Sequence, residues 1–238
     1  MSSADWAELD NVLAAGTVLR GATGGITPPS GGGSAVYVMN SVDGTVTGAV
    51  GLYCLIADFS PLAKGGSISG CIKKLSSSGN TGFSPFLFIG ASGHDVSDTA
   101  YLLGLENADP YRVVLRKTGT AGILGGIPEA ASGEYLRRSS GQEQISDDEY
   151  RHLKVDMILE PTNDIVLQVF ENDLSANPLG SAPDWQPIAG MTQFVDDVAG
   201  INSGSAPYLS GYAGFACSWA EAIGRRCAFD HVVIERQT

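Results

Sequence analysis

Residues of alternating polarity flank a short turn in the segment from Tyr150 to Asp173. Alternation of this kind places every second side chain on the same face, so each half predicts a strand with one buried face. The turn Pro161–Asp164 contains proline, asparagine and aspartate, which favour a tight reversal of the chain. The segment therefore predicts a β-hairpin, around which the rest of the chain must form a β-rich layer. The apolar positions of the two halves are Leu153, Val155, Met157, Leu159, Ile165, Leu167 and Val169.

Strand-like runs separated by turn residues recur along most of the chain. They cover Ala35–Asn40, Ala49–Ala57, Ser67–Leu75, Phe83–Ile89, Tyr101–Glu106, Tyr111–Lys117, Tyr212–Trp219 and Ala228–Glu235. Many short strands with few helices predict an all-β fold, an antiparallel two-sheet β-sandwich of the jelly-roll kind with a short N-terminal helix and long loops. A parallel α/β fold is excluded because its crossovers need helices that the sequence lacks.

The N-terminal part of the chain predicts a helix followed by an irregular arm. Asp5–Ala15 has a capping aspartate, Glu8 three residues later, and an apolar stripe that includes Trp6. The run Gly21–Ser34 consists almost entirely of turn-forming residues and predicts a long arm or loop. We therefore divide the chain into a helix and Gly/Pro-rich arm over residues 1–34 and a single β-sandwich domain over residues 35–238.

Two longer segments, Gly119–Asp148 and Leu179–Tyr208, interrupt the succession of strands. Both are predicted to be loops, the second with one helical turn around Met191–Val198. Long loops in a compact β domain are usually functional or contact surfaces. The two loops are therefore expected to be functional or contact surfaces.

The charge of the chain limits its partners. The 238 residues carry a formal net charge of -12, with a pI near 4.5. Nucleic acid is excluded as a partner, because such binding needs Lys and Arg side chains that neutralise phosphates. The N-terminus lacks the basic and apolar regions of an export signal, and no run of about 18 apolar residues predicts a membrane helix. We expect a soluble, unexported protein without membrane insertion.

The four cysteines, Cys54, Cys71, Cys217 and Cys227, lie in or beside predicted strands. No two of them have the close C-x-x-C spacing of zinc or redox sites, so we expect buried free thiols. A Cys217–Cys227 bridge across one hairpin is the alternative, although a protein that is not exported normally keeps its thiols reduced.

Two stretches near the C-terminus, Arg151–Asp173 and Gly211–Gln237, resemble the closing strands of the concanavalin A-like lectin/glucanase superfamily, the laminin-G-like jelly roll. In that family, too, a hairpin with an N-x-D turn precedes a Gly-Phe strand and a final Phe-Asp-x-Val strand. Three earlier stretches, Ile26–Ser41, Phe83–Gly90 and Ala100–Gly119, resemble structural proteins of tailed bacteriophages, which often use this sandwich as a virion module.

Carboxylates are the groups by which glucanases of this superfamily would be recognised. Those enzymes carry a Glu-x-Asp-x-x-Glu strand whose side chains act as nucleophile and acid/base, and retaining hydrolysis needs two carboxyl groups about 5–5.5 Å apart. The sequence lacks that motif. Its acidic cluster Asp147–Glu149 is consecutive, so the side chains diverge, and we expect a solvated entry to the hairpin. A G-x-S-x-G elbow is missing as well, so we expect no enzyme activity.

Lectins of the superfamily usually bind calcium through loop oxygens, and calcium takes six to eight of them. Two loops hold candidate ligands without a recognisable spacing: Glu106, Asn107 and Asp109 in one, and His94, Asp95 and Asp98 in the other. We interpret the first as a β-turn. The histidines His94, His152 and His231 stand apart from other catalytic residue types. We therefore expect no metal and no cofactor.

Exposed aromatic rings are the remaining candidates for a binding surface. Trp185 and Tyr208 lie in the second long loop and would suit either stacking on a sugar or contact with a protein. Filling the edge of the sandwich is the structural alternative for both. Trp6 and Trp219 are expected to be buried.

These observations favour a non-enzymatic structural protein of a bacteriophage particle, head- or tail-associated and assembled in the cytoplasm of a bacterial host. It would act through contacts with other virion subunits, as a symmetric homo-oligomer. The alternative is a carbohydrate-binding, lectin-like module that attaches to a host surface. A glycosidase with a disguised motif is the third possibility.

Overall fold

The structure is a computed structural model of the chain. It describes residues 6–8, 16–21, 26–33, 36–41, 48–54, 65–75, 83–106, 112–119, 122–123, 135–139, 149–200, 203–209, 211–219 and 226–236.

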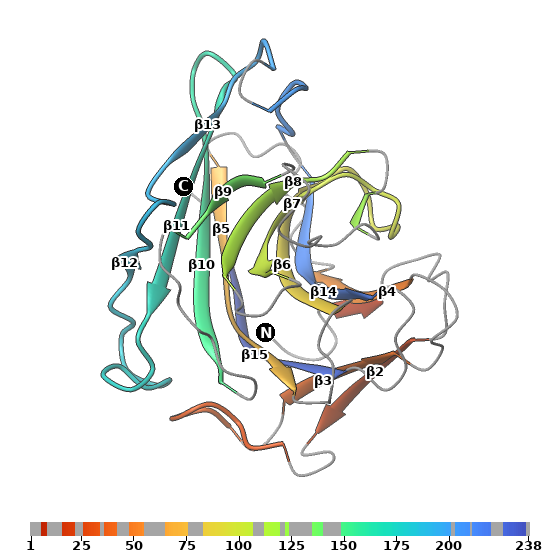
Figure 1. The fold of residues 1–238 in the computed structure, drawn as a ribbon, viewed down its shortest axis with the longest axis vertical. Helices are drawn as coiled ribbons and strands as arrows, with labels where there is room; N and C mark the ends of the chain where they lie inside the picture. The colour runs from red at the N-terminus through yellow and green to blue at the C-terminus, as the bar shows by residue number, and fades with distance from the viewer. Residues whose placement is uncertain are drawn as a thin grey trace.

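Two antiparallel β-sheets pack face to face in the described part of the chain (Figure 1). The seven-stranded sheet has, in spatial order, β1 (Trp6–Glu8), β4 (Gly48–Cys54), β14 (Tyr212–Trp219), β6 (Phe83–Ala91), β7 (Tyr101–Leu105), β8 (Val113–Lys117) and β9 (Tyr135–Arg138). The eight-stranded sheet has β12 (Gln186–Pro187), β11 (Ile165–Asn172), β10 (Arg151–Leu159), β5 (Gly65–Leu75), β15 (Arg226–Arg236), β3 (Val36–Ser41) and β2 (Gly16–Gly21), with β13 (Phe194–Asp196) also paired to β11. The predicted all-β sandwich of two antiparallel sheets is confirmed, whereas the jelly-roll connectivity stays a prediction.

The hairpin predicted from alternating polarity is formed by β10 and β11. Its strands pair in register from His152 opposite Asn172 to Leu159 opposite Ile165. Asn163 has a φ of 67°, a left-handed conformation that asparagine tolerates better than most residues. Its N–H donates to the carbonyl of Glu160 over 2.9 Å and closes the turn.

The main core fills the space between the sheets with the apolar positions that the hairpin pattern predicts. Leu153, Val155 and Met157 of β10 are almost inaccessible to solvent. The opposite sheet contributes fully buried side chains such as Leu87 of β6 and Phe215 of β14 to the same cluster. We call the face of the eight-stranded sheet that points toward this core the inner face and the opposite face the outer face.

The predicted N-terminal helix is wrong where the structure describes it. Trp6–Glu8 is strand β1, paired with β4, and the ring of Trp6 packs edge-on against Phe215 at a centroid distance of 5.0 Å. Packing on the core therefore outweighs the local capping pattern, since a short helix has little stability of its own. Residues 9–15 of the predicted helix lie outside the described part.

Two further differences concern segments that were predicted to be loops. The helical turn expected around Met191–Val198 is instead strand β13, whose residues pair with β11. Strand β2 lies between the predicted helix and the predicted arm, where no strand was expected, and pairs along its whole length with β3. Both strands form by pairing with a segment that is distant in the sequence. Their own residues therefore show little of the pattern that predicts a strand.

The cysteines whose side chains are described, Cys71, Cys217 and Cys227, are buried free thiols, as expected. Burial raises the pKa of Cys227 well above its ordinary value, and a hydrogen bond with Cys217 raises it further. The two thiols therefore lie side by side in the core without a disulfide. The side chain of Cys54 lies outside the described part.

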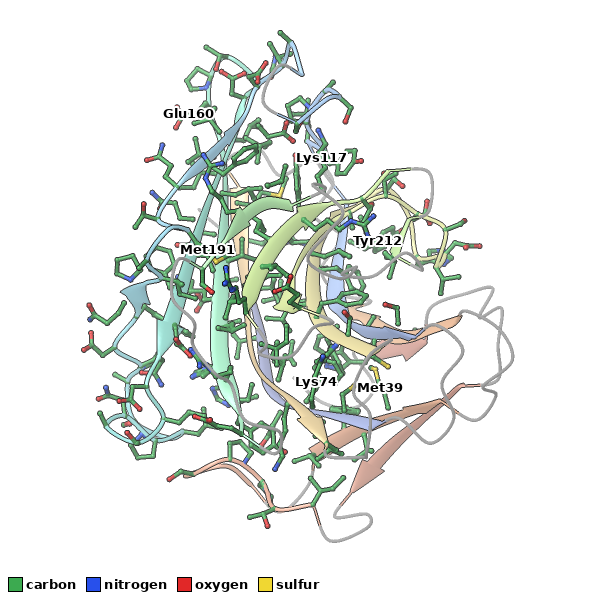
Figure 2. The ribbon with its side chains drawn as sticks, in the orientation of Figure 1. Met39, Lys74, Lys117, Glu160, Met191 and Tyr212 are labelled. Atoms are coloured by element: carbon green, nitrogen blue, oxygen red, sulfur yellow. The ribbon has the colours of Figure 1, made fainter. Side chains whose placement is uncertain are left out.

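A buried polar network fastens the loop after β13 to the seven-stranded sheet. The Lys117 ammonium and the Asp196 carboxylate are 2.8 Å apart, with side chains 3% and 0% exposed. Tyr101 and Ser203 donate hydrogen bonds to the same carboxylate. Lys117 also donates to two carbonyls of the loop, at Ser205 and Ala206. Figure 2 shows Lys117 toward one end of the sandwich and another buried lysine, Lys74, toward the other.

Replacing Asp196 by asparagine keeps the shape of the side chain but leaves the Lys117 ammonium buried without its carboxylate. We expect the free energy of unfolding to fall by about 3–5 kcal/mol, the usual cost of breaking a buried ion pair. Urea denaturation followed by tryptophan fluorescence measures the loss.

Asp156→Asn is the matched control, because Asp156 pairs with Lys154 while both side chains remain 18% exposed. Such exposed pairs contribute about 1 kcal/mol or less. Equal losses in the two variants would contradict the structural importance of the Lys117–Asp196 pair.

Candidate functional site

A short irregular segment crosses the outer face of the eight-stranded sheet. Residues Ile26–Gly33, which we call the strap, lie within the predicted Gly/Pro-rich arm (orange in Figure 1). Ile26 packs in an apolar cluster with Val36, Leu75 and Ala228 on that face. The strap is thereby held to strands from both ends of the chain.

The strap is also fixed to the loop that follows β11. The N–H of Leu179 donates to the carbonyl of Ser30 over 2.8 Å. Gly31 has a φ of 77°, and a Cβ at this position would lie 1.9 Å from the carbonyl oxygen of Leu179. Only glycine permits so close a crossing of two backbones.

A cleft of about 810 Å³ opens between the strap and the edge of the eight-stranded sheet. Its walls come from the strap, the start of β10, the end of β11, the loop after it, and the segment containing β12. The volume falls within the range of small-molecule binding sites. The lining residues are Thr27, Pro28, Pro29, Ser30, Lys73, Glu149, Tyr150, Arg151, Glu171, Asn172, Asp173, Leu174, Ser175, Gln186, Pro187, Ile188 and Ala189.

Planar polar side chains stand at the strand ends where the core stops. Arg151, at the start of β10, donates through Nε and Nη2 to the two carboxylate oxygens of Glu171 near the end of β11. The two side chains are 13% and 23% exposed. A bidentate pair of this kind is rigid, so the two side chains form a fixed, planar part of the cleft wall.

The side-chain amide of Asn172 makes hydrogen bonds within the wall of the cleft. Its Oδ1 accepts from the N–H of Asp184 over 2.9 Å, and its Nδ2 donates to the carbonyl of Asn177 over 3.0 Å. The same Nδ2 lies 3.2 Å from Nδ1 of His152. One buried amide thus fixes both sides of the loop between β11 and β12.

His152 supports this loop from the outer face of β10. Because an amide nitrogen can only donate, Nδ1 of His152 accepts, and the ring proton of the neutral form sits on Nε2. Burial and, as the smaller cause, the neighbouring His231 together lower the pKa of His152 to about 4. The ring of Trp185 packs on this neutral imidazole at 4.6 Å between centroids.

The two aromatic candidates from the sequence lie in different parts of the molecule. Trp185 is half-buried beside the cleft, where Gln186 is a lining residue, but its own ring contacts His152 and does not line the cleft. Tyr208 is half-buried against Tyr101, and its hydroxyl donates to the carbonyl of Thr118. The structure does not bring Trp185 and Tyr208 together, and a ligand- or partner-contact role for either stays a prediction.

The loop carboxylates considered as calcium ligands are used within the structure. Asp98 accepts from the Ser92 hydroxyl and from the N–H of Asp95, each over 2.8 Å, and Asp95 in turn accepts from Ser97. Glu106 is fully buried. Among the described residues, no group of three or more His, Cys, Asp and Glu side chains could hold a metal ion. Asn107, Asp109, Asp147 and Asp148 lie outside the described part, whereas Glu149 lines the cleft.

The histidines and tryptophans are likewise placed by packing. The ring of His94 lies edge-on to Tyr212 at 5.6 Å, and His231 lies edge-on to His152 at 5.9 Å. Trp6 is half-buried against the core, and the side chain of Trp219 lies outside the described part. No helix among the described residues has the length and apolar character needed to cross a membrane.

Sequence reasoning missed the cleft itself. Its lining joins residues of the predicted arm, such as Pro29, to the ends of the hairpin strands and to the loop beyond them. The Gly/Pro-rich run and the polar residues Glu171–Asp173 can both be recognised in the sequence. That these two segments lie close together cannot be predicted from it, because their proximity depends on where the strap crosses the sheet.

No family model matches this chain, and no curated protein sequence does either. The fold is nevertheless similar to that of solved structures. One is the carbohydrate-binding module CBM66 from Bacillus subtilis, with a TM-score of 0.50 and 12% identity over 97% of this chain and 95% of that one. Another is the cellulose-induced protein Cip1, with a TM-score of 0.53 and 12% identity over 100% and 94% of the two chains.

A third similar structure is the carbohydrate recognition domain of Emp46p in its potassium-bound form. Its TM-score is 0.50, with 11% identity over 99% of this chain and 90% of that one. At such low identity the likeness concerns the fold alone. The chain therefore shares its sandwich architecture with these three structures, two of which are named as carbohydrate-binding.

The buried neutral His152 makes stability depend on pH. Its pKa is about 4 in the folded protein and 6.5 in the unfolded chain. At a pH between these two values the unfolded chain therefore binds a proton that the folded chain does not. The contribution of neutral His152 to the free energy of unfolding is complete above pH 6.5 and is lost as the pH falls toward 4. We expect a loss on the order of 2–3 kcal/mol from this group, measured by urea denaturation at a series of pH values.

Replacing His152 by leucine should flatten this part of the pH profile. His231→Asn is the control, because burial rather than the neighbouring charge is the main cause of the shift. Asp230, whose pKa burial raises, acts in the opposite sense, and its carboxyl is retained in both variants. An unchanged slope in His152→Leu would contradict the assignment.

Proposed function

We propose that this protein is a non-enzymatic carbohydrate-binding module and that the cleft beside the strap receives the saccharide. The observation that carries the proposal is the cleft, which is lined by planar polar side chains at the edge of a lectin-like sandwich. The similarity in fold to carbohydrate-binding structures supports it.

The chemistry of the cleft suits a ligand rich in hydroxyl groups. A hydroxyl both donates and accepts, so it pairs well with side chains that supply either role in a fixed plane. Gln186 supplies both in one amide, which is held by its bond to Asp184, and it lies in the same lining as the planar Arg151–Glu171 pair. Pro29, Pro187 and Ile188 supply apolar surface for the C–H faces of a sugar ring.

Two carboxylates of the cleft are poorly set up for glycoside hydrolysis, which supports a binding role without catalysis. Hydrolysis needs a carboxylic acid that can give up a proton at the glycosidic oxygen. Both oxygens of Glu171 accept from Arg151. The pKa of Asp173 is held below its usual range by hydrogen bonds from Ser175. Neither group is therefore favoured as a proton donor.

A structural role in a bacteriophage particle, as a homo-oligomer in contact with other virion subunits, stays a prediction. The three similar structures described above support the carbohydrate-binding alternative better, since none of them is named as a virion component. Attachment of a virion to a surface glycan would combine both roles, and it too needs a saccharide site.

A bulky residue at the mouth of the cleft should abolish saccharide binding without disturbing the fold. Ala189 is exposed and lines the cleft, so Ala189→Trp fills it. We expect binding of a saccharide identified on a glycan array to fall by at least about tenfold in isothermal titration calorimetry, a loss of about 1.4 kcal/mol or more.

Ala182→Trp is the matched control, since Ala182 is also exposed in the same loop but does not line the cleft. It should bind like the unmodified protein. Equal affinity of Ala189→Trp and the unmodified protein would place the site elsewhere, and the absence of any bound glycan would refute the proposed function.

A further inference from the structure

One lysine at the cleft is nearly buried and has no carboxylate partner among the residues that the structure describes. Lys73 follows Ile72 of the core in β5 and pairs across the sheet with Ala228, so it belongs to the outer face. Only 8% of the residue is exposed. Its Nζ lies 4.8 Å from the centre of the Tyr150 ring, and both residues line the cleft.

Three other cations of the described part pair with carboxylates. Lys117 pairs with Asp196, Arg151 with Glu171, and Lys154 with Asp156. The Lys73 ammonium lies over the ring of Tyr150, and no carboxylate of the described residues pairs with it. A largely buried charge normally has a polar partner, because its desolvation is otherwise uncompensated. The three N–H donors of Lys73 are thus available for oxygens of a ligand.

The charges around Lys73 indicate what kind of oxygen it binds. The cleft is lined by two cations, Lys73 and Arg151, and by three carboxylates, Glu149, Glu171 and Asp173. Glu171 is occupied by Arg151, while Glu149 and Asp173 are exposed at the rim. An anionic ligand would add negative charge to this excess and to a protein whose net charge is already -12. The hydroxyl and ring oxygens of a neutral saccharide add no negative charge, so they avoid this repulsion.

We propose that Lys73 is the principal hydrogen-bond donor of the cleft and that it selects neutral saccharides over those bearing carboxylates. This inference rests on the proposed function and names the ligand class of the same site. Lys73 contacts the ligand directly, and the Tyr150 ring, over which the ammonium lies, holds the ammonium in position. The stem of Lys73 is packed before the ligand arrives, so little side-chain freedom is lost on binding.

The test compares two sets of probes by calorimetry with the full-length protein. The neutral set contains oligosaccharides of glucose, mannose, galactose and fructose. The acidic set contains oligosaccharides of glucuronate, mannuronate and galacturonate. We expect a neutral oligosaccharide to bind, with its carboxylated counterpart of the same linkage at least about tenfold weaker.

Lys73→Met keeps the length and apolar stem of the side chain and removes its donors. We expect it to weaken binding of the neutral oligosaccharide by about tenfold or more, because a charge-assisted hydrogen bond is lost. Lys154→Met is the control, since Lys154 is a paired lysine that does not line the cleft, and its affinity should stay within about twofold of the unmodified protein. Unchanged melting temperatures confirm that both variants are folded.

Tyr150→Leu tests the positioning role of the ring. It removes the cation–π contact and should weaken binding when Lys73 is present but not in the Lys73→Met background. Preference for uronates, or equal affinity of Lys73→Met and the unmodified protein, would overturn this inference and leave the proposed function standing. Binding of no oligosaccharide from either set would overturn both.

Discussion

The alternation of side chains along β10 and β11 is the constraint on which the rest of the structure depends. One register places Leu153, Val155 and Met157 in the core and, by the same geometry, sends His152 and Lys154 to the outer face. A slip by one residue would exchange these two sets, so burial of the apolar set fixes the pairing strongly. The ends of the same strands, where the core stops, hold Arg151 and Glu171. The polar wall of the cleft is therefore a consequence of the register that forms the core.

Polar groups are treated differently at the two places where they are buried. Around Asp196 they bond to one another: a lysine, a tyrosine and a serine all direct donors to one carboxylate. At the cleft, the Lys73 ammonium lies over an aromatic ring and has no carboxylate partner within the described part. The first arrangement stabilises a loop, because every member is satisfied by another. The second has donors without a charged partner in the described part, which is why we propose the ligand site at the cleft rather than at the Asp196 network.

The sequence was informative where burial and alternation act locally and uninformative where distant segments meet. The hairpin and the other strands of the core, such as β5 and β6, could be predicted because their residues show their burial directly. Trp6 was assigned to a helix because the residues around it have the capping and apolar spacing of a helix. In the structure it lies in a strand, and its ring packs against Phe215. β13 could not be recognised because its three residues form a strand only by pairing with β11. The cleft likewise depends on the strap, whose position follows from contacts with strands far away in the sequence.

The strap explains why the site and the fold cannot be separated. The same backbone that covers the apolar patch around Ile26 and Val36 supplies Thr27 to Ser30 as one wall of the cleft. Its hydrogen bond with Leu179 ties it to the loop that also carries Asp173 and Gln186. That loop is in turn held by Asn172, which is locked by the neutral His152. A saccharide bound between the walls would therefore stabilise the strap against the sheet, since a ligand that binds only the folded arrangement favours it by mass action.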